Sequence, residues 1–483
     1  MTLDVTFTDL FCGAGGSTDG ATAAGFIGKL GVNHWERAIE THAENFPHMK
    51  HDCADLSQTH PGRYFPTDVL IASPACQAHS NASGMKRSRQ QRNFFEEFDP
   101  EAERSRATAW NVVDFAEYHQ YKAIVVENVV EFRNWVLYDS WIHAMTKLGY
   151  DHRLVSLNSQ FALPTPQSRN RIYIVFWKAK LRAPDLEFRP LATCIKCGQK
   201  ESYQAFKPGR TYGQYGKNRQ YVYLCSECHT EVVPHSMPAS SVIDWSLPIP
   251  RVGDRKKPLC EKTMERIRVG IKKFVEPFIL GHRVDASYRS VEEPLLTIAA
   301  GGNHLFLVTP SGSDGERNAG IKPFLMGNYS PGWVRSVDGQ LGTITGDDHH
   351  SLVTPPGFLF SYRRDSDGQA VVQPLEASLP TVTAHASQHY ICAYYSAGEQ
   401  VASVDEPMPT VTTKDRLALV DGKVDVNDCG MRMLSPEELK LGMGFKPEYV
   451  IKGTAKERVK QAGNAVTPPA MALIMERVAR MFD

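Results

Sequence analysis

Short apolar runs, separated by polar and helical segments, predict a sheet within the first 180 residues. Five runs have the length and β-branched content of buried strands: residues 5–10, 29–33, 69–72, 123–129 and 172–176. Continuous apolar runs of this length are typical of strands covered on both faces. Because helical segments alternate with them, we expect an α/β fold with a largely parallel sheet.

Helix signals lie between these runs and near the end of the sequence. Ser17, Thr18 and Asp19 can cap a helix that runs to about Gly25. Ser435 followed by Pro436 is a typical helix start, with a capping hydroxyl and a proline in the first turn. Further helices are expected over residues 104–119 and 468–482.

A glycine-rich turn follows the first strand at once. Residues 11–16 read Phe-Cys-Gly-Ala-Gly-Gly, and glycines at a strand end let a ligand approach the backbone closely. The amides of the next helix favour a carboxylate or phosphate. The turn fits a dinucleotide, adenosylmethionine or tight packing alone. It lacks Gly-Lys-Ser/Thr, which argues against a nucleoside triphosphate.

The next two strands end in residues suited to a nucleoside. His34, Trp35 and Glu36 follow the second strand, where an aromatic ring and an acid can serve an adenine face and ribose hydroxyls. A short strand near His51 ends with Asp55-Leu56, a further candidate for the adenine edge.

A cysteine follows the apolar run at 69–72. Ser73 and Pro74 end that strand, because proline cannot donate to a sheet ladder. Cys76 therefore lies just past the carboxyl end of a strand, where open α/β sheets place their chemistry. It is a candidate nucleophile, and the alternative is a small buried apolar residue.

Charged residues also mark two other strands. Glu127 ends the run at 123–129, and a carboxylate at that place has to be paired or used. Gln167, Arg169 and Arg171 precede the run at 172–176, and alternate residues of a strand share one face. Three long polar side chains on one face suit an anion or a base.

Two Cys-x-x-Cys pairs in the middle of the chain predict a metal site. Cys194, Cys197, Cys225 and Cys228 can supply four thiolates to a tetrahedral structural zinc ion. The aromatic run at 221–224 suits a hairpin between the pairs. His229 is an alternative ligand, and chance spacing of buried cysteines is the alternative to a metal site. Six cations nearby favour a ribbon that faces nucleic acid: Lys196, Lys200, Lys207, Arg210, Lys217 and Arg219.

The region after the cysteines contains a recurring segment. Thr297, Thr343, Thr381 and Thr410 each follow a short Pro- or Gly-containing stretch and precede an apolar residue. Short strands separated by such turns indicate a β-rich module over residues 275–422. What this module binds stays open.

Composition sets few limits on function. The chain of 483 residues has 42% apolar and 22% charged residues and a net charge of zero. A local basic run at residues 85–92 can still meet phosphates. Ten cysteines and no basic amino-terminal segment favour a reducing, cytoplasmic setting without a signal peptide. No apolar stretch is long enough to span a membrane.

The order of these motifs resembles the DNA cytosine-5 methyltransferases. Those enzymes carry a Phe-x-Gly-x-Gly-Gly turn, a Pro-Cys-Gln loop, Glu-Asn-Val, Gln-x-Arg-x-Arg and a late Gly-Asn-Ala/Ser-Val. The corresponding segments here are residues 11–16, 76–77, 127–129, 167–171 and 463–466. The resemblance implies a Rossmann-like class I methyltransferase domain at 1–180, completed by 430–483. It also implies a target-recognition region at 181–429 that is β-rich and contains the zinc ribbon at 190–232.

The resemblance also implies a reaction and its residues. Adenosylmethionine would donate a methyl group to C5 of a cytosine flipped from double-stranded DNA, with the protein acting as a monomer. The thiolate of Cys76 would add to C6 of the cytosine, and Glu127 would hold or protonate its N3. Arg169 would hold the O2 oxygen of the base, with support from Arg171 and Gln167. The implied cofactor residues are Phe11, Gly13, Ala14, Gly15, Gly16, His34, Trp35, Asp55, Leu56, Asn464 and Val466.

Two positions depart from the family pattern. Ala75 replaces the proline before the cysteine, and His34 replaces the acid before the aromatic residue, where Glu36 is a substitute. Two alternatives remain at this point. One is an RNA cytosine-5 methyltransferase, and the other is a DNA-binding homologue with weakened catalysis.

Overall fold

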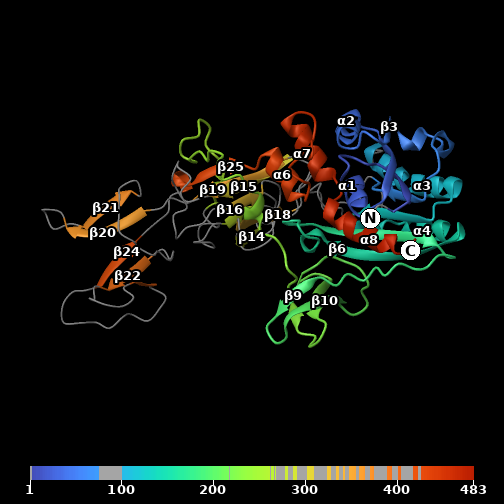
Figure 1. The fold of residues 1–483 in the computed structure, drawn as a ribbon. Coiled ribbons are helices and arrows are strands. Elements are labelled where there is room, and N and C mark those ends of the chain that lie inside the picture. Colours follow the sequence, from blue (N-terminus) through green and yellow to red (C-terminus); the bar gives the residue numbers. More distant parts are fainter. Residues whose placement is uncertain are drawn as a thin grey trace, which may run out of the picture.

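The centre of the fold is a seven-stranded sheet with the order β3-β2-β1-β4-β5-β8-β6 (Figure 1). The computed structural model describes residues 3–74, 100–216, 218–261, 263–265, 267 and 426–482, and the strands between 278 and 421. The sheet strands are β1 (Thr6–Leu10), β2 (Ile27–Asn33), β3 (Lys50–Cys53), β4 (Val69–Ala72), β5 (Ala123–Asn128), β6 (Tyr150–Asn158) and β8 (Asn170–Lys178). The predicted strands are confirmed. The first five in spatial order are parallel, while β8 runs antiparallel between β5 and β6.

Both faces of this sheet are buried, as the continuous apolar runs predict. Val69, Ile71 and Val125 belong to one hydrophobic cluster, and their neighbours Leu70 and Val126 belong to the other. This split follows from the alternation of side chains along a strand. The covering helices are α1 (Gly16–Ala23), α2 (Glu36–Asn45), α3 (Pro100–His119), α4 (Tyr138–Lys147), α6 (Pro436–Gly442), α7 (Ala455–Asn464) and α8 (Pro468–Ala479).

The carboxyl-terminal helices return to the first part of the chain. Helix α8 packs against α1, so the two ends of the chain lie side by side (Figure 1). A side chain added at Gly20 would come within 2.5 Å of the Pro468 carbonyl oxygen, which measures how closely the helices approach. The predicted helix at 468–482 is confirmed, and it ends three residues earlier, at Ala479.

The start of α1 differs from the prediction. Its N-cap is Gly15, with a left-handed backbone (φ 87°), and no side chain caps it. Ser17 and Thr18 instead donate hydrogen bonds to the buried carboxylate of Asp9. The expected capping by these residues is therefore wrong, because a buried acceptor on β1 takes their hydroxyl groups.

A four-stranded antiparallel sheet and its turns contain the four cysteines. It has the order β12-β11-β10-β9, formed by β9 (Leu191–Cys194), β10 (Gly198–Phe206), β11 (Tyr221–Cys225) and β12 (Glu231–Val232). The predicted hairpin is confirmed, since β11 pairs with β10 from Tyr221↔Phe206 to Cys225↔Ser202. We call this sheet the cysteine ribbon.

The described residues between 278 and 421, together with residues 430–433, form short strands. They are β13 (Phe278–Leu280), β14 (Ser287–Ser290), β15 (Gly302–Val308), β16 (Phe324–Gly327), β17 (Trp333–Ser336), β18 (Leu341–Gly342), β19 (Asp348–Thr354), β20 (Phe358–Arg364), β21 (Ala370–Pro374), β22 (His389–Ala393), β23 (Val401–Ser403), β24 (Leu417–Asp421) and β25 (Gly430–Met433). Strands β15, β16, β19 and β25 close into a small barrel. The four recurring threonines lie outside the described residues: Thr297, Thr343, Thr381 and Thr410.

One strand of this region pairs with the Gln-x-Arg-x-Arg segment at 167–171. Strand β18 pairs in parallel with β7 (Gln167–Ser168), with Leu341 opposite Gln167 and Gly342 opposite Ser168. The remaining elements are 3-10 turns: η1 (Leu56–Gln58), η2 (Pro61–Arg63), η4 (Val130–Asn134), η5 (Ser159–Phe161), η6 (Ala239–Val242) and η7 (Val426–Asp428). Among the described residues, no helix is both long and apolar enough to cross a membrane.

Candidate active site

The glycine turn after β1 is shaped by close packing. Phe11, Gly13 and Gly15 all have positive φ, at 59°, 53° and 87°. A β-carbon on Gly15 would come within 2.5 Å of the Tyr449 hydroxyl, and one on Gly16 within 2.0 Å of the Val466 carbonyl oxygen. Tight packing therefore requires glycine at both positions. The same packing brings the carboxyl-terminal segment against the turn.

A chain of buried polar groups lies under this turn. Thr18 Oγ1 is 2.7 Å from Asp9 Oδ2 and 2.9 Å from His42 Nε2, and His42 Nδ1 is 2.9 Å from His51 Nε2. Because the Thr18 hydroxyl donates to Asp9, His42 Nε2 has to donate to Thr18 and His51 to His42. Burial raises the pKa of Asp9 to about 7 and lowers that of His42 to about 3.

The predicted nucleoside contacts lie where β2 and β3 end, at one edge of the sheet. Trp35 is half-buried, and the Lys460 ammonium on α7 lies 4.9 Å from its ring centroid. His34 is exposed. Asp55 is also exposed, and its carboxylate accepts a hydrogen bond from the Ser57 amide at 3.0 Å. Leu56 is buried.

The carboxyl ends of β4 and β5 are joined by a hydrogen bond. Asn128 Nδ2 donates to the Pro74 carbonyl oxygen at 3.2 Å, and Asn128 is buried. Pro74 is the last described residue of this stretch, and both Ala75 and Cys76 lie outside the described residues. The bond fixes the point at which the chain leaves β4 toward Cys76.

Glu127 forms a nearly buried ion pair with Arg171. Arg171 Nε lies 3.0 Å from Glu127 Oε1, and the two side chains are 15% and 10% exposed. Glu127 and Arg171 come from the neighbouring strands β5 and β8, at the edge where β4 also ends. Arg171 also donates to the Asn170 carbonyl oxygen at 2.8 Å. A carboxylate and a guanidinium are thus held together beside the point where the Cys76 segment begins.

Arg169 has other partners. Its guanidinium donates to the carbonyl oxygens of Gly463 at 3.1 Å and Ala465 at 3.2 Å, so it holds the turn between α7 and α8. Asn464, between them, is exposed, and Val466 is buried. Gln167 is fully buried, and neither polar atom of its amide has a hydrogen-bond partner among the described residues.

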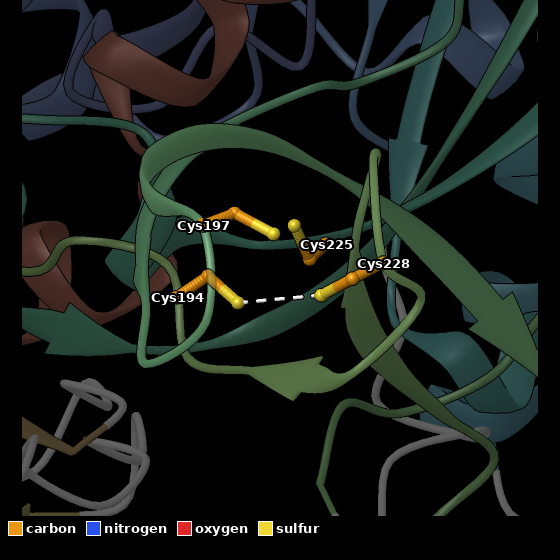
Figure 2. Close-up of side chains that lie close together, drawn as sticks. All are labelled: Cys194, Cys197, Cys225 and Cys228. Atoms are coloured by element: carbon orange, nitrogen blue, oxygen red, sulfur yellow. Dashed lines mark hydrogen bonds between the residues drawn. The ribbon is translucent and has the colours of Figure 1, made fainter.

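The four cysteines of the ribbon converge (Figure 2). Their sulfur atoms all lie within 4.8 Å of one another, and Cys194 Sγ is 3.5 Å from Cys228 Sγ. Each Cys-x-x-Cys pair is followed directly by a residue with positive φ, Gly198 at 72° and His229 at 57°. His229 Nδ1 lies 3.0 Å from the Tyr203 hydroxyl and is not part of the cluster. Hydrogen bonds from Thr230 lower the pKa of Cys228 to about 6.

Comparison with known proteins places this chain. A family model described as C-5 cytosine-specific DNA methylase matches residues 5–262 and 362–480. The chain belongs to this family. It is 28% identical over 190 residues to the type II methyltransferase M.HgiCII of Herpetosiphon aurantiacus, covering 38% of this chain and 39% of that protein. It is 29% identical over 186 residues to the type II methyltransferase M.AgeI of Thalassovita gelatinovora, covering 34% and 38%. The chain thus spans about two fifths of the length of these relatives.

The candidate site is surrounded by residues that the sequence patterns did not indicate. Asp9 and His42 lie under the turn, Tyr449 donates a hydrogen bond to the Ala14 carbonyl oxygen, and Lys460 covers Trp35. Asp9 lies inside an apolar run that contains no basic residue. An acid without a nearby opposite charge was the one feature of the sequence that could have pointed to it. Tyr449 and Lys460 gave none, because their contacts join segments more than 400 residues apart.

Proposed function

We propose that this protein is a DNA cytosine-5 methyltransferase that uses adenosylmethionine. The Glu127–Arg171 pair beside the end of β4 is the observation that carries the proposal. A buried carboxylate and guanidinium can hold the N3 and O2 edge of a cytosine while a nucleophile on the adjacent segment attacks C6. The protein would act in the cytoplasm as a monomer on double-stranded DNA, with the target base flipped out.

Cys76 is the nucleophile in this proposal. Its thiolate adds to C6, and the electron pair moves toward C5, which becomes able to attack a methyl group. Glu127 protonates or hydrogen-bonds N3, and so stabilises the charge that develops in the ring. After transfer, a base removes the C5 proton and the Cys76–C6 bond breaks, which restores the aromatic ring.

Arg171 is the better candidate for the base O2 oxygen. Its guanidinium lies beside Glu127, whereas that of Arg169 is used on the Gly463 and Ala465 carbonyl oxygens. Arg169 would then hold the segment around Asn464 in place. Gln167 keeps a supporting role, since its buried amide lacks partners that a bound base or a neighbouring segment would supply.

Adenosylmethionine supplies the methyl group as an electrophilic sulfonium carbon. The glycine turn would receive its amino-acid portion through backbone groups of Gly13 and Ala14, because Gly15 and Gly16 are occupied by packing. Trp35 would stack on the adenine, with Asp55 and Leu56 at its edge. For the ribose hydroxyls, His34 and Glu36 are both exposed and within the same segment.

The four cysteines would hold a structural zinc ion. Four sulfur atoms within 4.8 Å of one another match the ligand type and number that zinc prefers in structural sites. Cys194, Cys197, Cys225 and Cys228 would all bind as thiolates. The ion would fix the cysteine ribbon, which we propose is part of the target-recognition region at 181–429 together with the strands of 275–422.

Transfer of a tritiated methyl group from adenosylmethionine to unmethylated DNA tests the function. We expect incorporation into DNA as 5-methylcytosine, none into RNA, and a covalent adduct on DNA that contains 5-fluorocytosine. Cys76→Ser should form no adduct and lose about 10⁴-fold or more of its activity, because the nucleophile is gone, yet bind adenosylmethionine normally. Wild-type turnover in Cys76→Ser, or label in RNA alone, would overturn the proposal.

A further inference from the structure

We infer that the loop at 211–216 of the cysteine ribbon positions the arginine pair of the active site through Asn170. The metal site and the active site are then mechanically coupled. This inference rests on the proposed roles of Arg169 and Arg171, and it adds a positioning residue that the family motif leaves unspecified.

The loop lies against the sheet at its edge strand β6 and the neighbouring strand β8. The Gly213 amide donates to Ser156 Oγ on β6 at 3.0 Å. The Tyr215 amide donates to Asn170 Oδ1 on β8 at 2.9 Å. The Tyr215 ring meets that of Phe161 edge-on, with centroids 4.8 Å apart. Two main-chain hydrogen bonds and a ring contact therefore hold the loop at the point where β8 begins.

Asn170 lies between Arg169 and Arg171 in the sequence. It is hydrogen-bonded to Arg171 directly and is connected to Arg169 through Asn158. Its Oδ1 also accepts a hydrogen bond from Asn158 Nδ2 at 3.1 Å, while Asn158 Oδ1 accepts one from the Arg169 amide at 3.2 Å. The Asn170 carbonyl oxygen accepts from Arg171 at 2.8 Å. One side chain thus links the loop to the backbone from which both guanidinium groups extend.

The same loop is carried by the strands that hold the cysteines. Strand β10 begins directly after Cys197, and β11 ends at Cys225, so the loop and the cysteine cluster are the two ends of one hairpin. Between them, Tyr221 and Tyr223 are fully buried, and both ring centroids lie 5.8 Å from that of Tyr215. Because metal binding supplies folding energy to sites of this kind, loss of the ion would loosen the hairpin and its loop.

Substitution of Asn170 tests the link in the full-length protein. Asn170→Ala removes the acceptor of two hydrogen bonds, and we expect about a tenfold loss in kcat/KM for DNA with unchanged affinity for adenosylmethionine. Asn170→Asp keeps an oxygen acceptor and should recover most of the loss. Gln214→Ala is the matched control from the same loop, since Gln214 Nε2 bonds to Glu131 at 2.9 Å and not to Asn170. It should keep wild-type kcat/KM.

Amide hydrogen exchange tests the coupling without any activity measurement. Zinc removal by a chelator and a thiol reagent should increase exchange in peptides from 150–178 and 205–225, and leave the peptide from 6–23 unchanged. Asn170→Ala with zinc present should increase exchange in the 150–178 peptide. If the purified protein holds no metal, if metal removal leaves 150–178 unchanged, or if Asn170→Ala weakens cofactor binding as much as turnover, the inference is wrong. A protein inactive on DNA that still shows the exchange changes would fail the proposed function and keep the coupling.

Discussion

Burial is the largest cause of the shifted pKa values of Asp9 and His42, the two side chains under the glycine turn. Asp9 is fully buried and accepts hydrogen bonds from Ser17 and Thr18, yet desolvation outweighs both and raises its pKa to about 7. His42 is buried beside His51, and its pKa falls to about 3 for the same reason. Near neutral pH the folded protein thus holds a neutral imidazole and a carboxyl that is partly protonated.

Asp9→Asn should change how stability depends on pH. The pKa of Asp9 rises from 3.8 to about 7 on folding, so the folded state binds more protons across that interval. Its contribution to stability is present below the unfolded pKa and declines as pH rises through the interval. The free energy of unfolding of Asp9→Asn relative to wild type should therefore increase from pH 5 to 7, by on the order of 1 kcal/mol per unit.

Urea titrations at pH 5, 6, 7 and 8 would measure this difference, with Asp68→Asn as the control. The Lys122 ammonium lies 2.7 Å from Asp68, and hydrogen bonds with Lys122 and Thr6 lower the pKa of that carboxyl below 3.8 despite its desolvation. Asp68 is ionised above pH 5 in both the folded and the unfolded protein. The difference in free energy of unfolding between Asp68→Asn and wild type should therefore stay constant. A constant difference for Asp9→Asn as well would contradict the assignment.

At the scale of elements, two helices start with the same motif in different surroundings. Ser435 and Glu438 form a capping box on α6, and Thr454 and Glu457 form one on α7. Glu438 is 1% exposed and also accepts from both terminal nitrogens of Arg432 at 2.8 and 2.7 Å. It therefore joins α6 to β25, whereas Glu457 is partly exposed and, among the described residues, has only Arg37 as an ionic partner, at 3.5 Å.

Glutamate replacements should separate the local and long-range roles of these boxes. Glu457→Ala should cost about 1 kcal/mol, which is typical of a lost cap. Glu438→Ala should cost about 3–5 kcal/mol, because the nearly buried Arg432 loses its carboxylate partner. Denaturant midpoints of the two variants would measure the difference. Equal losses would mean that the Arg432 pair contributes nothing beyond the cap.

Strands were easier to predict than the residues around the site. The runs at 69–72 and 123–129 are apolar on both faces, and that pattern alone indicates central strands. Strand β6 was not predicted, because residues 151–153 in its first half are exposed at the sheet edge and show no apolar pattern. The clustering of the four cysteines could be predicted from the sequence, because Cys-x-x-Cys pairs are recognised by residue type and spacing alone. Partners such as Arg169 and Gly463 were not, since that contact depends on how the whole chain folds.

For the molecule as a whole, the last fifty residues pack against the first part of the chain. Tyr449 donates to the Ala14 carbonyl oxygen, Val466 closes on Gly16, and Arg169 holds the turn at 463–465. The chain leaves the seven-stranded sheet after β8 and packs against it again with α6. The glycine turn therefore acquires its final shape only when both ends of the chain have met.

Tyr449→Phe should weaken cofactor binding more than it perturbs packing. The phenyl ring keeps its contact with Phe445, at a centroid distance of 4.6 Å, but the Ala14 carbonyl oxygen loses its donor. We expect a destabilisation of about 1–3 kcal/mol and up to a tenfold loss of adenosylmethionine affinity by calorimetry. Tyr150→Phe is the matched control, since the Tyr150 hydroxyl also donates to a buried carbonyl oxygen, that of Tyr121, at 2.8 Å. A similar loss of affinity in both variants would contradict this role of Tyr449.

The pairing of β18 with β7 bears on how the proposed target-recognition region is attached to the seven-stranded sheet. It joins Leu341–Gly342 to Gln167–Ser168 through main-chain pairing, in which every residue type except proline can take part. Sequence drift on the far side of that junction leaves the docking geometry intact. Modules with unrelated surfaces could thus be exchanged during evolution, or in engineered chimaeras, while the residues that precede β8 keep the same neighbour.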